Sequence, residues 1–159
     1  MTIDNSLGSA MPDLMPFLVG GTVTAVTLVF HAAALGATSL VIHHVLRMVH
    51  NRRPFTRITV ALTVAGSLLT AAHFMEVALW AVVYRVFAVT AQPDAWIYFA
   101  FVNYTTLGYG DVLAKPEWRL LGPITATDGI MLFGLTTALL FHVINVADSG
   151  RPLITRPPP

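Results

Sequence analysis

Three long apolar segments alternate with short polar stretches along the chain. They run from Phe17 to about Val49, from Phe55 to about Thr90 and from Leu120 to about Val146. Each exceeds the roughly 20 residues that a helix needs to cross the hydrocarbon core of a bilayer. The pattern therefore predicts three transmembrane helices, and the second is long enough to tilt or to project beyond the bilayer.

A fourth apolar segment, from Ala95 to Tyr104, is too short to span a bilayer. The break Gln92-Pro93-Asp94 precedes it, and Asp94 is predicted to be the N-cap of a short helix. A glycine-containing loop follows, and a turn with Pro116 and Trp118 leads to the last long segment. The sequence thus predicts a short helix and a loop between the second and third spans.

The composition agrees with a membrane protein. Of 159 residues, 55% are hydrophobic and only 11% are charged, and the mean hydropathy is +0.70. Soluble domains carry about 25% charged residues. The sequence contains no cysteine, which excludes a disulfide, a thiolate metal site and a cysteine nucleophile. No basic region precedes the first apolar run, so no cleaved signal peptide is expected.

The stretch with the most specific chemistry is Thr105-Thr106-Leu107-Gly108-Tyr109-Gly110-Asp111. A bare cation can be recognised by a column of backbone carbonyls that replaces its hydration shell. A regular helix or strand cannot aim successive carbonyls at one axis. Glycine enters conformations with positive φ at little cost, so Gly108 and Gly110 would let the backbone do so.

The neighbouring side chains fit the same interpretation. Thr106 can add a hydroxyl oxygen at the inner end of the column. Leu107 and Tyr109 would point away from the axis and pack the loop from behind. Asp111 would sit at the outer mouth and attract cations.

This stretch resembles the pore of the potassium channel family, whose T-x-G-Y-G-D motif occurs in full from Thr106 to Asp111. Together with the three predicted transmembrane helices, the resemblance implies an all-α membrane protein with a re-entrant pore helix and a filter loop. It implies K⁺ bound by the backbone carbonyls of Thr106, Leu107, Gly108 and Tyr109, with Gly110 completing the filter. Since one chain supplies one loop and a fourfold ring needs four, it also implies a homotetramer.

The resemblance also divides the chain. Residues 1–16 are an outer leader, 17–54 an additional helix with a basic connection, 55–147 the pore domain and 148–159 a cytoplasmic tail. The additional helix departs from a minimal two-helix pore, and it would serve as a peripheral brace or as a docking site for a regulatory subunit. The basic connection sets the topology or binds anionic lipid.

The placement of basic residues predicts the orientation in the cell membrane. One group comprises Arg47, Arg52, Arg53, Arg57, Arg151 and Arg156, and the other comprises Arg85, Lys115 and Arg119. The positive-inside rule places the larger group, and with it the C-terminus, in the cytoplasm. Three spans then place the N-terminus outside and the loop near the outer face.

The last long segment resembles the inner helix of the family. The resemblance assigns Gly129 and Gly134 to a hinge, although both glycines would equally serve close packing. One helical face would line the cavity, and it comprises Ile130, Phe133, Thr137 and Phe141.

Ionisable residues within apolar spans are costly and suggest a function. His73 and Glu76 lie three residues apart on one face of the second helix, and Asp128 lies nearly opposite the predicted cavity face. We predict a polar cluster behind the filter that joins His73 and Glu76 with Asp128 or Asn103. Such a cluster would make opening sensitive to pH, or it would be a purely structural hydrogen-bond network.

One departure from the family leaves a second function open. Two positions usually filled by tryptophans that brace the filter carry Tyr98 and Phe99, and Phe99 cannot donate a hydrogen bond. A weakly selective cation channel is therefore the alternative to a K⁺-selective one. No helix carries an arginine at every third position, so a voltage sensor of the usual kind is not expected.

A function of a different class is a haem-binding electron-transfer protein, since His31, His73 and His142 lie in spans. That reading leaves the glycine-containing loop unexplained. We expect no enzyme activity, no cofactor, no nucleic acid and no small-molecule substrate. The expected partners are further copies of the chain and membrane lipid.

Overall fold

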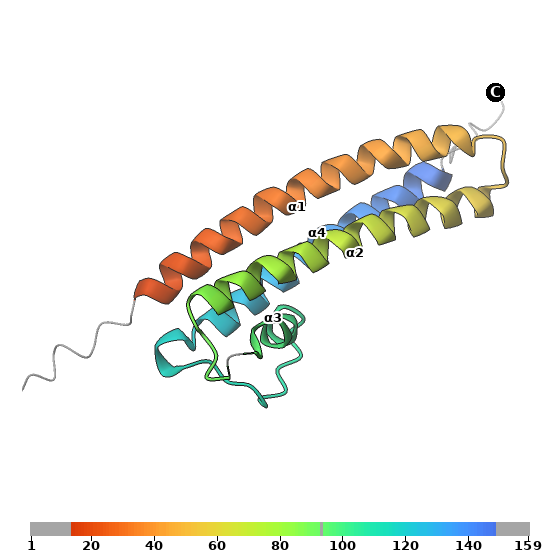
Figure 1. Ribbon diagram of the computed structural model, residues 1–159. Coiled ribbons are helices and arrows are strands. Elements are labelled where there is room, and N and C mark those ends of the chain that lie inside the picture. The colour runs from red at the N-terminus through yellow and green to blue at the C-terminus, as the bar shows by residue number, and fades with distance from the viewer. Residues whose placement is uncertain (1–13, 93, 149–159) are drawn as a thin grey trace, which may run out of the picture. The chain divides into compact units, whose positions relative to one another are not determined.

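The computed structural model describes residues 14–92 and 94–148, and the regular structure within them is helical. The helices are α1 (Leu14–Met48), α2 (Pro54–Val86), α3 (Trp96–Tyr104), the short 3-10 helix η2 (Pro116–Trp118) and α4 (Leu121–Asp148) (Figure 1). One isolated antiparallel bridge joins Thr90 to Ala114. The leader up to residue 13 and the tail from residue 149 lie outside the described residues.

The prediction of three membrane spans is confirmed. Three helical stretches are long and apolar enough to cross a bilayer, namely Leu14–Met48, Pro54–Val86 and Pro116–Asp148. The short segment between the second and third is a separate helix of nine residues. An all-α membrane fold with a short additional helix follows, as the hydrophobic pattern indicates.

The predicted helix bounds need three corrections. Helix α1 begins at Leu14, before Phe17, because Pro16 is compatible with the first turn of a helix. Helix α2 ends at Val86 because Ala88 adopts a φ of 46°, which the right-handed helix cannot continue. The N-cap of α3 is Ala95, without a side-chain cap, so the prediction for Asp94 is wrong.

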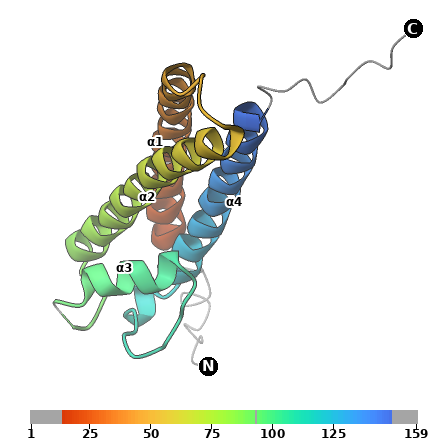
Figure 2. The same cartoon turned by 90° about the vertical axis from the view of Figure 1, so that its right-hand side faces the viewer.

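The described residues form two compact units. The first contains the start of α1 up to Thr27 and residues 77–130, and the second contains residues 28–76 and the rest of α4 from Met131. Helices α1, α2 and α4 each contribute a stretch to both units. In the first unit α3 lies across the end of α2 (Figure 2). The core of the second unit consists of Ile42, Leu46, Ala61, Ala65, Val143 and Ala147.

Candidate functional site

The loop after α3 has an alternating backbone conformation. Thr106, Gly108 and Gly110 have positive φ angles of 60°, 57° and 77°, whereas the residues between them do not. Alternation of positive and negative φ turns successive peptide groups so that their carbonyls can face one side. The expected positive φ of both glycines is confirmed. Thr106 adopts it too, at a cost of about 1–2 kcal/mol for a residue with a Cβ.

The start of the loop is tied to the last turn of α3. The amides of Thr106 and Leu107 donate to the carbonyls of Asn103 and Val102, each at 2.9 Å. The Thr105 hydroxyl donates to the carbonyl of Phe101 at 2.7 Å. These bonds hold the left-handed Thr106 in place, because its amide would otherwise lose its partner.

Helix α3 is positioned by α2 and α4 within the first unit. The buried Tyr84 of α2 packs on the ring of Phe99, with a centroid distance of 5.2 Å. The Tyr84 hydroxyl lies 2.6 Å from that of Thr125 on α4. Gly129 of α4 lies against the carbonyl of Tyr104, where a Cβ would collide with the oxygen. Gly129 therefore serves close packing, and no observation bears on its predicted hinge role.

The outer part of the loop is held by polar and aromatic contacts. Tyr98 donates a hydrogen bond of 2.6 Å from its hydroxyl to Oδ2 of Asp111, and this bond raises the pKa of Tyr98. The Lys115 amide donates to the Val89 carbonyl at 2.8 Å. The rings of Phe87 and Trp118 lie 5.1 Å apart. Tyr98 was predicted only as a departure from the family, and its bond to Asp111 was missed.

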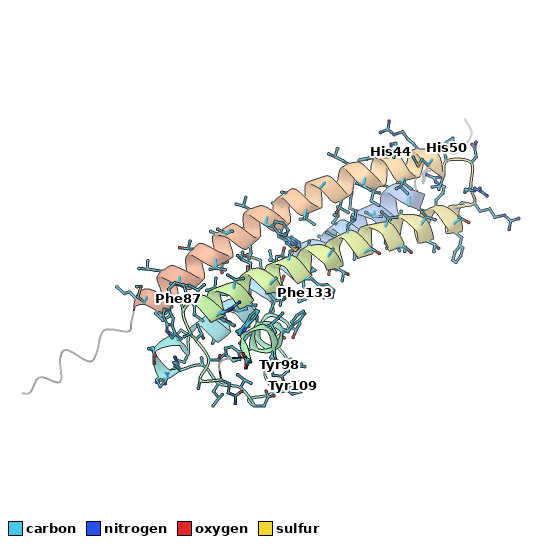
Figure 3. All side chains as sticks on the ribbon, in the orientation of Figure 1. His44, His50, Phe87, Tyr98, Tyr109 and Phe133 are labelled. Atoms are coloured by element: carbon cyan, nitrogen blue, oxygen red, sulfur yellow. The ribbon has the colours of Figure 1, made fainter. Side chains whose placement is uncertain are left out.

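Leu107 and Tyr109 do not pack the loop from behind within this chain. These residues are 53% and 67% exposed, and Tyr109 lies near Tyr98 of α3 (Figure 3). A cavity of about 440 Å³ adjoins the loop, and its lining includes Phe99, Val102, Gly108, Gly110, Leu113 and Pro123. One chain alone therefore leaves both the loop and the space beside it uncovered.

Asp128 is fully buried and accepts hydrogen bonds from two helices. The Thr27 hydroxyl of α1 lies 2.8 Å from Oδ2 and the Trp80 indole of α2 donates to the same oxygen at 2.7 Å. Asp128 thus points toward neighbouring helices, as its place opposite the predicted cavity face indicated. Asn103, proposed for the same cluster, donates to the Phe99 carbonyl at 2.9 Å.

His73 and Glu76 belong to a second buried polar group, whose other members are His31 of α1 and Thr136 of α4. Glu76 lies 2.8 Å from Nδ1 of His31 and 3.0 Å from Nδ1 of His73. The predicted pairing of His73 with Glu76 is confirmed, whereas the part played by His31 and Thr136 was not foreseen. The four-residue cluster behind the filter stays a prediction.

The geometry does not support the haem alternative. The rings of His31 and His73 are 5.1 Å apart and one carboxylate bridges them, so no porphyrin fits between them. His142 is exposed on α4.

The predicted cavity face of α4 is exposed in the single chain. Ile130, Phe133, Thr137 and Phe141 are all solvent-accessible, and Phe133 also contacts the ring of His73. A Cβ at Gly134 would meet nothing within 4 Å. Both the cavity lining and the hinge stay predictions. The cavity would form between copies of the chain, and no observation bears on bending at Gly134.

The fold and the loop have the features of a pore-forming membrane protein: three candidate spans and a short helix that ends in a loop of alternating conformation. Residues 72–145 match the family model described as "Ion channel". The match covers most of α2, all of α3, the loop and most of α4, and it supports an ion-channel function, a multi-pass membrane location and an oligomeric assembly. Comparisons with curated proteins and with solved structures gave no match.

Proposed function

We propose that the protein is a potassium-selective ion channel in which the loop from Thr106 to Gly110 is the selectivity filter. The observation that carries this proposal is the alternation of positive φ at Thr106, Gly108 and Gly110. Combined with the T-x-G-Y-G-D sequence, it provides the carbonyl column that a dehydrated K⁺ requires. Conduction through backbone carbonyls needs no cofactor and no enzymatic step.

The pore is a homotetramer with fourfold symmetry. A single loop offers carbonyls from one side only, so several copies must surround the ion. The exposure of Leu107 and Tyr109, the cavity beside the loop and the exposed face of α4 all fit surfaces that neighbouring copies cover. The distribution of Lys and Arg supports a cytoplasmic C-terminus and a position of Asp111 at the outer mouth.

The weakly selective channel is the alternative to be tested. It rests on Phe99, which is buried against Tyr84 and offers no hydrogen bond to the filter. In this sequence the neighbouring Tyr98 makes the polar contact, and it does so with Asp111 at the mouth.

Reversal potential measured in a planar bilayer tests the proposal, with K⁺ on one side and Na⁺ on the other. We expect reversal close to the K⁺ equilibrium value. Gly110→Ala should abolish selectivity or current, since a Cβ disfavours its φ of 77°. Gly66→Ala is the matched control, because its Cβ would meet nothing within 4 Å. Reversal near zero with robust current would favour the weakly selective channel.

A further inference from the structure

A closed ring of hydrogen bonds lies in the second unit, formed by His31, His73, Glu76 and Thr136. The carboxylate of Glu76 contacts Nδ1 of both histidines, at 2.8 Å and 3.0 Å. The Thr136 hydroxyl lies 2.9 Å from Nε2 of His73 and 3.3 Å from Nε2 of His31. His31 and Glu76 are fully buried and His73 nearly so.

The two ring nitrogens of each histidine contact different partners. Both Nδ1 atoms face the carboxylate, and both Nε2 atoms face the same hydroxyl. Two imidazoles and a carboxylate inside apolar helices are costly to bury, and apolar packing would join the helices more cheaply. The convergence of both Nδ1 atoms on one carboxylate therefore points to a ligand.

We propose that His31, His73 and Glu76 bind a divalent metal ion of the zinc class. Two imidazoles and one carboxylate are a known donor set for Zn²⁺, which takes a water in the fourth position. One donor atom of each residue lies within 4.8 Å of the other two. Tetrahedral bonds of about 2.0–2.1 Å separate donor atoms by about 3.3 Å. The two contacts of 2.8 Å and 3.0 Å, which go to different oxygens of Glu76, would therefore lengthen by a few tenths of an ångström.

Thr136 completes the site as the partner of the ligands. A histidine that binds a metal through one nitrogen almost always donates the other N–H to an oxygen, which fixes the ring. A hydroxyl oxygen has two lone pairs, so Thr136 can accept from both Nε2–H groups at once. It lies at hydrogen-bond distance from both nitrogens already.

Binding of one Zn²⁺ to this group releases one proton. If each of these four hydrogen bonds carries one hydrogen, the group holds four hydrogens without metal. With Zn²⁺, each imidazole keeps its Nε2–H toward Thr136, the hydroxyl keeps its own hydrogen, and Glu76 keeps none. One proton leaves, and the charge of the group rises from zero to plus one, as expected for metal binding to protonated ligands.

The metal would join helices that are distant in sequence. His31 belongs to α1, His73 and Glu76 belong to α2, and Thr136 belongs to α4. The additional N-terminal helix would then supply a ligand, and the site would go beyond the expectation that the protein binds no cofactor. The His73 side chain is 10% exposed and forms the solvent-accessible edge of the proposed metal site.

Co²⁺ titration of the full-length protein tests the site, since Co²⁺ replaces Zn²⁺ and its visible bands distinguish tetrahedral from octahedral coordination. The protein is made without a histidine tag, freed of metal with a chelator and studied in detergent. We expect tetrahedral bands that saturate at about one Co²⁺ per chain and vanish when Zn²⁺ is added. Glu76→Gln and His31→Gln should lose them, and Thr136→Val should weaken binding by about 10–100-fold.

A matched control removes the other histidines. The exposed His43, His44, His50 and His142 are replaced together by glutamine, which leaves only His31 and His73. We expect this variant to keep the tetrahedral bands. Their loss in it, their persistence in Glu76→Gln, or octahedral Co²⁺ alone in the native protein would overturn the proposal.

A second measurement covers variants that do not fold. X-ray absorption at the zinc edge, on the four-histidine control loaded with Zn²⁺, should show imidazole scattering from two ligands. Zinc without imidazole scattering, or no retained zinc, would overturn the site. Neither measurement uses ion conduction, so the site can fail while the proposed channel function stands.

Discussion

Gly129 of α4 packs directly against the backbone carbonyl of Tyr104, the last residue of α3. The loop begins at the next residue, so this contact fixes α3, which leads into the T-x-G-Y-G-D loop, against α4, which follows that loop. A Cβ in this position would also lie 3.0 Å from the carbonyl carbon of Tyr104. The contact is between backbone and backbone, and no side chain can rotate to relieve it.

Gly129→Ala is therefore expected to destabilise the protein by about 1–3 kcal/mol, the usual range for overpacking. The melting temperature in detergent measures this. Gly134→Ala, five residues along the same helix, should melt at or above the temperature of the native protein, because its Cβ would meet nothing within 4 Å and alanine favours a helix over glycine. Equal melting of the two variants would contradict the contact. An altered open probability in Gly134→Ala at unchanged melting would instead support its predicted hinge role.

The bond from Tyr98 to Asp111 predicts a pH dependence at the mouth of the loop. The bond raises the pKa of Tyr98, so its stabilisation is present below the ordinary tyrosine pKa of about 10 and is lost as the pH rises through the raised value. If the loop is the proposed filter, loss of this contact should loosen the mouth of the loop. We therefore expect the rate at which the channel current decays to change in that alkaline window. Tyr98→Phe should show the altered rate at neutral pH and no further change on alkalinisation.

Asp111→Asn breaks the same contact from the other end. Since both variants remove one interaction, the double variant should resemble the singles more than their sum. Little change in stability is expected in either variant, because Tyr98 is exposed. Fully additive changes in decay rate would show that the two residues act separately.

The sequence predicts the helices well because they are long and apolar, and it predicts the glycine conformations because the loop motif demands them. It does not predict which polar residues meet. His31 of α1 lies 45 residues from its partner Glu76 along the chain, and Thr27 of α1 lies 101 residues from its partner Asp128. Helix rotation decides such contacts, and an apolar helix without a polar face gives little indication of it.

The small residues that pack the helices show the same limit. Glycine is an obvious candidate for close contact, yet Gly21 and Gly36 have nothing within 4 Å of their Cβ positions. The second unit instead packs at Ala61, Ala65 and Ala147, which are fully buried. Alanine is common in every span, so its pattern singles out none of these positions.

Asp128→Asn is expected to destabilise the protein by about 1–3 kcal/mol. Thr27 and Trp80 both bond to the same carboxylate, and the amide that replaces it has one acceptor oxygen and an NH₂ group. The amide oxygen can replace Oδ2 for both donors, but these bonds lose the charge of the acceptor, and the NH₂ group takes the place of Oδ1, 3.0 Å from the Thr27 hydroxyl. Trp80→Phe removes one donor and keeps the carboxylate bonded to Thr27, so its loss should be smaller. A larger loss in Trp80→Phe would indicate that packing of the indole outweighs its hydrogen bond.

Ala65 and Gly66 are neighbours on α2 in opposite surroundings, and this contrast tests the packing of the second unit. Ala65 is fully buried in a core with Ile42 and Val143, whereas a Cβ at Gly66 would meet nothing within 4 Å. Ala65→Leu should therefore cost about 1–3 kcal/mol, since close helix contact leaves no room for a larger side chain. Gly66→Leu should leave the melting temperature unchanged or raise it, because leucine favours a helix over glycine by up to about 1 kcal/mol. Destabilisation by Gly66→Leu in detergent would mean that this side of α2 is also covered, by another copy or by another part of the chain.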